Sequence, residues 1–391
     1  MHDASPKKSE HRSEVPKPPW ALTSLLREKP SSGDWGYLGS GTPVACNEKE
    51  LAEKARKSGA ESILLVWTPN HPLVQTVYEV PQIADSVAAR LKKELWNRIG
   101  ASLILFPLLG VIAVLVREDR RQREFWILIL AIFVLIPIVD AALGLARLKR
   151  QLPTMLVAEN EMIRFSLWES RMPRWLTNRG MWLLIGVYVI QHVTGIQDSA
   201  AKAGLVKSAV REGDWTRLLT GVFLHAASPL HIWFNVMAWR VAGKTVESLM
   251  GWWTLAPLFL VSALCGSLTS LWWLTRGTSI GASGGICGVI GCILVLGIRF
   301  RHQLPKGFAR GIWGSVAYTV GMGLAAPNVI DNGAHLGGLI GGILFGGVCI
   351  PWNLKCLPTP SSTLRRGIAT VALALLGAFA GVAAIRLFQG R

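Results

Sequence analysis

The chain has 391 residues, of which 51% are hydrophobic and 17% are charged, and its mean hydropathy is +0.37. These values exclude an ordinary soluble protein, which is less apolar, and also a chain that lies entirely within a membrane. The formal net charge of +17 is compatible with a nucleic-acid partner. The basic residues, however, lie in loops between apolar segments, so we expect a multi-pass protein of the lipid bilayer with no nucleic-acid partner.

The part of the chain before the first apolar segment is polar and divides into two regions. Residues 1–30 contain lysines, arginines and prolines but no apolar core, which predicts a disordered tail rather than a signal peptide. Residues 31–97 are expected to form a small cytoplasmic domain with mixed secondary structure. The elements expected within it are a helix at 48–58, strands at 62–67 and 73–80, a turn at 68–70, and a helix from 81 to 98.

Apolar windows long enough for membrane spans follow, since a spanning helix needs roughly 20 mostly apolar residues. The uncharged windows are 99–116, 252–275, 278–298, 311–330, 332–354 and 367–385. Further windows at 125–146, 175–196 and 231–249 contain charged residues. We therefore predict a transmembrane hairpin at 98–147, a basic cytoplasmic connector at 148–174 and a membrane domain at 175–391.

The distribution of lysine and arginine predicts the orientation of these spans. The loop after the window at 278–298 carries Arg299, Arg301, Lys306 and Arg310 and no acidic residue, so it should be cytoplasmic. The loop at 117–124 would then face outward if the N-terminus is cytoplasmic, and its arginines conflict with that placement.

The tetrapeptide Gly281-Ala282-Ser283-Gly284 lies near the start of an apolar segment. A serine hydroxyl becomes a nucleophile only when a neighbouring base accepts its proton. The flanking glycines Gly281 and Gly284 permit a tight turn and leave room for a substrate. The N-terminus of the following helix favours developing negative charge. The motif alone is more typical of a serine that caps a helix in a glycine-rich packing face, so Ser283 is a candidate nucleophile only if a base is present.

His335 lies near the start of the apolar segment at 332–354. Ionisable residues within membrane spans are uncommon and usually functional, which makes His335 the candidate base. The alternative is a histidine at the membrane surface that faces water.

Glycines recur every four residues in both segments. They are Gly333, Gly337 and Gly341 in the histidine segment, and Gly281 with Gly285 and Gly284 with Gly288 in the serine segment. Faces of this kind let helices approach closely, so we expect these faces to bring the two helices together.

His231 and Asn235 are four residues apart and lie on one face of a helix. Both can donate hydrogen bonds, and acyl transfer requires donors directed at the oxyanion of the tetrahedral intermediate. The alternative is a polar helix start at the membrane surface.

These motifs together resemble the rhomboid intramembrane serine proteases. The motifs are the Gly-x-Ser-Gly turn at 281–284, the His-x-x-x-Asn step at 231–235 and the Gly-Ala-His-x-x-Gly segment at 333–338. The resemblance covers roughly residues 175–355. Less specific matches are Arg217, His225, Gly243 and Glu247. The chain differs from the family in having Trp215-Thr216-Arg217 where a Trp-Arg pair is common, and in a His225-to-His231 interval that is one residue longer.

The resemblance implies an all-α polytopic fold with a rhomboid-like six-helix core. A C-terminal helix, the extra N-terminal hairpin and the small soluble α/β segment are added to this core. It implies that Ser283 is the nucleophile, that His335 is the general base and then the acid, and that His231, Asn235 and the Ser283 N–H form the oxyanion hole. Arg217, His225 and Glu247 are expected to support the site, Glu247 by stabilising the long loop at 197–230. Asp331 is expected to be a loop residue and not a third catalytic member. The implied substrates are transmembrane proteins, and no metal or cofactor is expected.

Two other functions are compatible with parts of the sequence. A non-catalytic scaffold that binds membrane helices would conserve the fold but would not need the dyad. A transporter would require inverted repeats and broken helices, and no internal repeat is evident. We expect the membrane to be a bacterial inner membrane.

Overall fold

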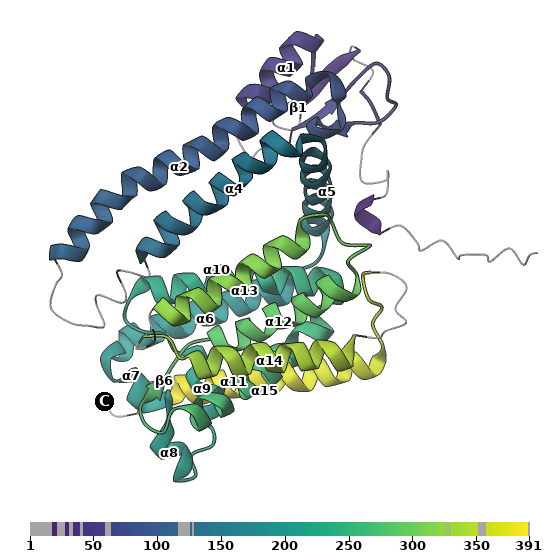
Figure 1. Ribbon diagram of the computed structural model, residues 1–391. Coiled ribbons are helices and arrows are strands. Elements are labelled where there is room, and N and C mark those ends of the chain that lie inside the picture. Colours follow the sequence, from purple (N-terminus) through teal and green to yellow (C-terminus); the bar gives the residue numbers. More distant parts are fainter. Residues whose placement is uncertain are drawn as a thin grey trace, which may run out of the picture.

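The computed structural model describes residues 18–21, 28–30, 34–39, 42–58, 64–115, 126, 129–325, 327, 329–350 and 357–389. It has three parts: a bundle of long helices, a helical hairpin beside the bundle, and a small domain with a β-sheet (Figure 1). The predicted tail lies almost entirely outside the described residues, as does the loop expected at 117–124.

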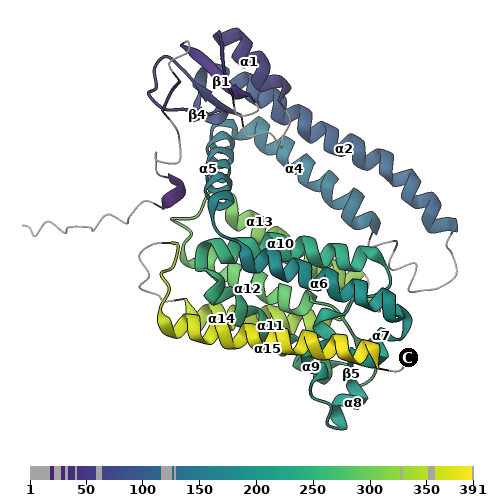
Figure 2. The ribbon, with the colours of Figure 1, turned by 180° about the vertical axis from the view of Figure 1, so that it is seen from behind.

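The predicted membrane domain is a bundle of helices that run side by side (Figures 1 and 2). Its long helices are α6 (Trp175–Thr194), α10 (Pro229–Met250), α11 (Trp252–Trp273), α12 (Ser283–Arg299), α13 (Phe308–Ala325), α14 (Asn332–Cys349) and α15 (Thr363–Phe388). A six-helix core with an additional C-terminal helix is therefore confirmed. Four described helices are long and apolar enough to cross a membrane, namely those at Ala131–Arg150, Trp252–Trp273, Asn332–Cys349 and Thr363–Phe388, and the shorter α12 is also apolar.

Helix α14 packs closely against α11 and α12 because glycines without side chains line both contacts. A methyl group on Gly338 would lie 1.9 Å from the carbonyl oxygen of Gly284, and one on Gly342 would lie 1.8 Å from that of Gly288. The expected role of Gly333, Gly337 and Gly341 is wrong. Methyl groups on these three would meet Trp273, Thr269 and Cys265 of α11. Glycines spaced by four residues lie on one face of a helix, and in α14 that face contacts α11 and not α12.

The long connection between α6 and α10 forms short elements around one end of the bundle. These are α7 (Ile196–Ala203), β5 (Leu205–Val206), α8 (Lys207–Arg211), α9 (Arg217–Thr220) and the turn η6 (Gly221–Phe223). Strand β5 pairs antiparallel with β6 (Thr278–Ser279), and Leu205 lies opposite Ser279. The segment before Ser283 is therefore a paired strand, and the span expected to begin at residue 278 begins at Ser283 instead.

The N-terminal domain contains a four-stranded antiparallel sheet in the order β2-β1-β3-β4. Its strands are β1 (Trp35–Gly39), β2 (Thr42–Cys46), β3 (Leu65–Trp67) and β4 (Gln75–Thr76). The helix expected at 48–58 is confirmed as α1 (Glu48–Lys57), which Asn47 caps. The strand expected at 73–80 is wrong for most of its length. Only Gln75–Thr76 form a strand, Leu73 makes an isolated bridge with Glu28, and Val77–Glu79 form a 3₁₀ turn. Strands β1 and β2 were not predicted.

The hairpin consists of α2 (Ala84–Leu115) and α4 (Ile136–Arg150), which follows the π-helical turn η5 (Ala131–Leu135). Helix α2 joins the expected domain helix to the first span without a break. Gly144 of α4 lies against the side chain of Leu95, where a methyl group would be 2.8 Å from Leu95 Cδ2.

The expected connector is a 20-residue helix, α5 (Leu152–Arg171), which runs across the ends of the bundle helices (Figure 1). Trp20 of the 3₁₀ turn η1 (Pro19–Ala21) packs on it, with its ring centroid 5.1 Å from that of Phe165 and 5.0 Å from that of Trp168. The backbone N–H of Lys306 donates to Glu161 Oε2 at 2.7 Å. The basic loop that follows α12 therefore lies at the same end of the bundle as α5.

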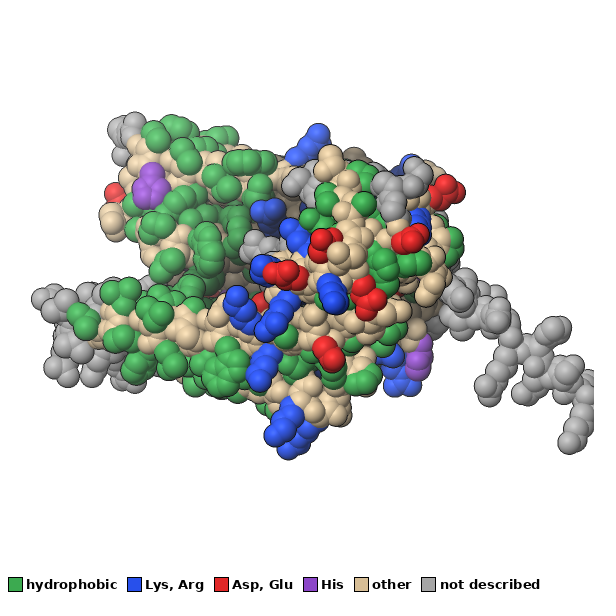
Figure 3. All heavy atoms as spheres, turned by 90° about the horizontal axis from the view of Figure 1, so that it is seen from above, with side chains coloured by type: hydrophobic (Ala, Val, Ile, Leu, Met, Phe, Trp, Pro, Cys, Tyr) green, Lys and Arg blue, Asp and Glu red, His purple; other side chains and the backbone are tan. Residues whose placement is uncertain are grey.

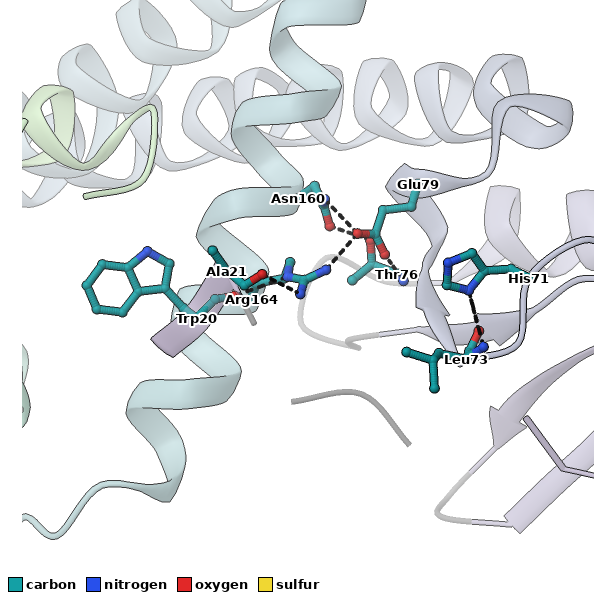
Figure 4. A network of polar contacts seen from close by, with 8 residues as sticks. All are labelled: Trp20, Ala21, His71, Leu73, Thr76, Glu79, Asn160 and Arg164. Carbon is teal, nitrogen blue, oxygen red and sulfur yellow. Dashed lines mark hydrogen bonds and ion pairs between the residues drawn. The ribbon is translucent and has the colours of Figure 1, made fainter. Parts of the chain in front are cut away.

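A polar network joins the N-terminal domain to α5 (Figure 4). Arg164 Nη1 donates to Glu79 Oε1 at 2.9 Å, and Arg164 Nε donates to the carbonyl oxygen of Trp20 at 3.1 Å. Asn160 Nδ2 also donates to Glu79 Oε1, at 3.1 Å. In the view from above, Lys, Arg, Asp and Glu side chains gather toward this domain, whereas hydrophobic side chains cover the far part of the helices (Figure 3).

Candidate active site

The starts of α10, α12 and α14 surround one cavity of about 660 Å³. The side chains of Ser283, His335, His231 and Asn235 all line it. Residues about a hundred positions apart in the chain thus line one cavity.

Ser283 is the first residue of α12, and Ala282 occupies the N-cap position. The helix-capping alternative for this serine therefore does not apply. The preceding turn depends on Gly281, whose φ of +124° is unfavourable for other residues. The Gly281 N–H donates to the carbonyl oxygen of Gly221 at 3.0 Å, and this bond fixes the turn to the long connection between α6 and α10.

His335 lies in the first turn of α14 with its ring directed at Ser283. Its Nε2 is 2.8 Å from Ser283 Oγ, which is hydrogen-bonding distance. Its Nδ1 is buried without a partner among the residues that the structure describes. Asp331, four residues earlier, accepts from the Ala334 N–H and from serine hydroxyls instead. The arrangement is a serine–histidine pair with no carboxylate bound to the histidine.

His231 has a defined tautomer because the Ala226 N–H donates to its Nδ1 at 3.1 Å. The neutral ring then carries its proton on Nε2. That nitrogen lies beside the serine turn, since a methyl group on Gly281 would be 3.0 Å from it. A nitrogen that can donate a hydrogen bond therefore lies close to Ser283.

Asn235 is buried one turn after His231 on the same helix. Its Nδ2 donates one hydrogen to the carbonyl oxygen of His231 at 2.9 Å. An amide nitrogen carries a second hydrogen, which is available to the cavity. The N–H of Ser283 also belongs to a first helical turn, where N–H groups have no partner within the helix.

Residues 212–352 match the family model for the rhomboid domain. The chain is 34% identical over 135 residues to the Rhomboid protease GluP of Bacillus subtilis. This alignment covers 34% of this chain and 26% of GluP. It is 35% identical over 131 residues to RHOMBOID-like protein 7 of Arabidopsis thaliana, covering 33% of this chain and 41% of that protein. It is 33% identical over 127 residues to Rhomboid protein 1, mitochondrial, of Saccharomyces cerevisiae, covering 30% and 37% respectively.

This chain therefore contains a rhomboid domain. It aligns with well under half of the length of each of these relatives. The comparisons together with the apolar helices establish a multi-pass membrane protein. The expected bacterial inner membrane stays a prediction, because the relatives include plant and mitochondrial proteins.

His225 packs behind His231. It is fully buried, and its ring packs edge-on against His231 with 5.2 Å between centroids. Gln191 of α6 holds the backbone on both sides of the residue: its Oε1 accepts the His225 N–H at 2.9 Å and its Nε2 donates to the His225 carbonyl oxygen at 2.9 Å. Gln191 was not predicted, because a lone glutamine in an apolar span carries no motif.

Arg217 braces the long connection between α6 and α10. Its Nη1 donates to the carbonyl oxygens of Ala201 at 2.9 Å and Gly204 at 3.0 Å, and its Nε donates to Asp214. These bonds hold the connection that accepts the Gly281 N–H. None of these three bonds reaches Ser283 or His335.

The expected role of Glu247 is wrong. The buried carboxylate accepts the N–H groups of Leu176 at 3.0 Å and Thr177 at 2.8 Å, and the Thr177 hydroxyl at 2.6 Å. It therefore caps the start of α6 at the opposite end of the bundle from the long connection. Unsatisfied N–H groups at a helix start explain this preference for a carboxylate.

No group of three or more His, Cys, Asp or Glu side chains suited to a metal ion occurs in the described parts of the chain. The site contains acid–base and hydrogen-bonding groups, which are the groups needed for acyl transfer.

Proposed function

We propose that this rhomboid protein is an intramembrane serine endopeptidase that cleaves transmembrane segments of other membrane proteins. The observation that carries the proposal is the 2.8 Å contact between Ser283 Oγ and His335 Nε2 at the wall of a cavity between membrane helices. A serine next to an imidazole nitrogen at this distance is the arrangement of an activated nucleophile.

In the proposed reaction, His335 Nε2 accepts the proton of Ser283 as Oγ attacks the carbonyl carbon of a peptide bond. The resulting tetrahedral oxyanion collapses, the C–N bond breaks, and His335 returns the proton to the leaving amine. Water then attacks the acyl-enzyme ester, with His335 again as base, and Ser283 is released with its proton. Each proton moves between Ser283, the substrate, the attacking water and one imidazole, so no carboxylate is required in the balance.

The proposed oxyanion hole consists of His231 Nε2–H, the second Asn235 amide hydrogen and the Ser283 N–H. The tautomer of His231, fixed by Ala226, supports this assignment because it leaves the donor on the nitrogen nearest the serine turn. Donors that are already oriented stabilise the transition state without reorganisation.

The walls of the cavity support a membrane-spanning substrate. Apolar residues of two helices extend the lining away from the dyad, namely Trp233, Met237 and Val241 of α10 and Tyr318 and Met322 of α13. A helical segment hides its backbone in its own hydrogen bonds, so the bond to be cut must lie where the substrate helix unwinds. We expect cleavage near glycine, proline or small residues.

The N-terminal domain is proposed to lie on the cytoplasmic side. Helix α5 supports this proposal because it connects the domain to the end of the bundle with basic residues, namely Arg299, Arg301, Lys306 and Arg310. Basic residues at the ends of spans favour the cytoplasmic side.

The test is cleavage of a model single-span substrate in proteoliposomes by the wild type, Ser283→Ala and His335→Ala. Each substitution should lower cleavage to background while leaving thermal unfolding unchanged. A fluorophosphonate should label the wild type and not Ser283→Ala. If the wild type binds the substrate helix but neither cleaves it nor becomes labelled, the protein is the non-catalytic scaffold.

A further inference from the structure

Asp331 connects the start of the His335 helix to two serines on neighbouring segments. Its Oδ1 accepts the Ala334 N–H at 2.9 Å. Its Oδ2 accepts hydrogen bonds from Ser270 at the end of α11 and from Ser279 in β6. One carboxylate therefore joins α11, β6 and α14.

Lys207 completes this network from the long connection between α6 and α10. Its side chain is fully buried, its Nζ lies 3.7 Å from Asp331 Oδ2, and it donates to Ser279 Oγ. Its backbone N–H donates to the carbonyl oxygen of Gly277 at 3.2 Å. Both the backbone and the side chain of Lys207 thus hold the β6 strand.

The charges of this pair depend on each other. Burial lowers the pKa of Lys207, while the Asp331 carboxylate opposes that effect. Burial would raise the pKa of Asp331, but hydrogen bonds from Ser270, Ser279 and the Ala334 N–H hold it below its ordinary value. Removal of one partner would leave a buried charge uncompensated, which is strongly unfavourable.

The network joins the two segments that carry the members of the dyad. Ser279 precedes the Gly281 turn that leads to Ser283, and the Asp331 carbonyl oxygen accepts the His335 N–H at 3.1 Å. The turn itself contains the positive-φ glycines Gly277 and Gly281, which restrict the backbone little. Contacts outside the turn must therefore set its position.

We propose that Asp331 and Lys207 are positioning residues that fix the serine turn against the start of α14 and so set the distance between Ser283 Oγ and His335 Nε2. This inference rests on the proposed peptidase function. Reacting groups must be held to within a fraction of an ångström, since a displacement of about 1 Å can lower the rate roughly 100-fold. The pair does not touch the substrate bond and acts only through the dyad.

The experiment compares Asp331→Asn, Lys207→Met, the double variant and Ser279→Ala in proteoliposomes. For each, kcat and KM for the model substrate, the rate of fluorophosphonate labelling of Ser283 and the thermal unfolding midpoint are measured. Each single charge variant should lower kcat and the labelling rate by about 10- to 100-fold with KM within about 2-fold of the wild type. Ser279→Ala removes one link without leaving a buried charge and should lower kcat by about 3- to 10-fold.

The double variant separates positioning from folding. Because it removes both buried charges, its unfolding midpoint should return toward that of the wild type. Its kcat and labelling rate should stay reduced by about 10-fold, since Lys207 no longer holds Ser279. Wild-type kcat in the double variant and in Ser279→Ala would overturn the proposal, because the pair would then serve charge balance alone.

A matched control is Lys244→Met, which breaks the Lys244–Glu169 pair, whose Nζ–Oε2 distance is 2.5 Å. This pair lies near the opposite end of α10 from His231, and its loss should leave kcat unchanged. The Ser283→Ala variant distinguishes the two proposals. If it still cleaves, the assignment of Ser283 as the nucleophile is wrong. If it is inactive while Asp331→Asn, Lys207→Met and Ser279→Ala all keep wild-type kcat, only the positioning role is wrong.

Discussion

Gly338 lies against the carbonyl oxygen of Gly284, with room for a hydrogen atom and for nothing larger. Because Gly284 directly follows Ser283 and Gly338 lies one turn after His335, this contact sets how closely the two dyad helices approach. The hydrogen bond of the dyad therefore depends on two residues that carry no side chain.

Gly338→Ala should separate α12 from α14 and lower both stability and activity. Overpacking of a tight core typically lowers the free energy of unfolding by about 1–3 kcal/mol. The loss of kcat should be larger than partial unfolding alone would cause, because the distance between Ser283 Oγ and His335 Nε2 increases. The measurements are thermal unfolding and the labelling rate of Ser283. Gly347→Ala, on the same helix but with nothing within 4 Å of the added methyl group, should retain wild-type values. Equal effects of both substitutions would contradict this explanation.

His231→Ala should lower kcat by about 10²- to 10³-fold, the usual effect of removing one oxyanion donor. KM should change little because the oxyanion exists only after attack. Asn235→Ala should have a smaller effect, since one of its amide hydrogens is already used by the His231 carbonyl. Steady-state kinetics on the model substrate measure both. A change in KM with kcat preserved would assign these side chains to substrate binding.

The C-terminal helix α15 is attached to the long connection by Arg386, whose Nη1 and Nη2 each lie 2.9 Å from a carboxylate oxygen of Asp214. Arg386→Gln should lower thermal stability at neutral pH, by no more than about 1 kcal/mol because the pair is partly exposed. The comparison of unfolding midpoints with the wild type at pH 7 measures this loss.

The same pair should make stability depend on pH. The hydrogen bonds from Arg386 hold the pKa of Asp214 well below its usual range. The ion pair therefore contributes its full stability at pH values above about 3.9, the pKa of an aspartate in the unfolded chain. This stability is lost as the pH falls from there toward the pKa of Asp214 in the folded protein. The difference between wild type and Arg386→Gln should shrink below about pH 4. A difference that is constant from pH 7 to pH 3 would show that the ion pair is not its cause.

Glu79→Gln should loosen the N-terminal domain from α5, because it weakens the charge-assisted bond from Arg164 shown in Figure 4. Hydrogen exchange should become faster at residues 75–83 while kcat on the model substrate stays unchanged. Glu53→Gln provides the control, since its pair with Lys57 is exposed to water and should affect neither measurement. Slower cleavage by Glu79→Gln would indicate that the domain acts on the active site.

The sequence by itself determined the membrane class, the helical core and the residues that meet at the cavity. Apolar windows identify spans because a bilayer excludes unsatisfied polar backbone. Ser283 and His335 are recognisable because a serine on a Gly-x-Ser-Gly turn at the start of an apolar segment and an ionisable residue within one are both uncommon. The helix at 48–58 was also predictable, since its capping box lies within a few residues of sequence.

Only the tertiary structure decided which surfaces meet. Gly333, Gly337 and Gly341 have the expected spacing but face α11, because spacing defines a helix face and not its neighbour. Glu247 caps α6, and Lys207 binds Asp331, across separations that no local pattern records. Strands β1 and β2 form only by pairing with each other and with β3. Such contacts depend on how distant segments pack, and that information is spread over the whole chain rather than carried by any one segment.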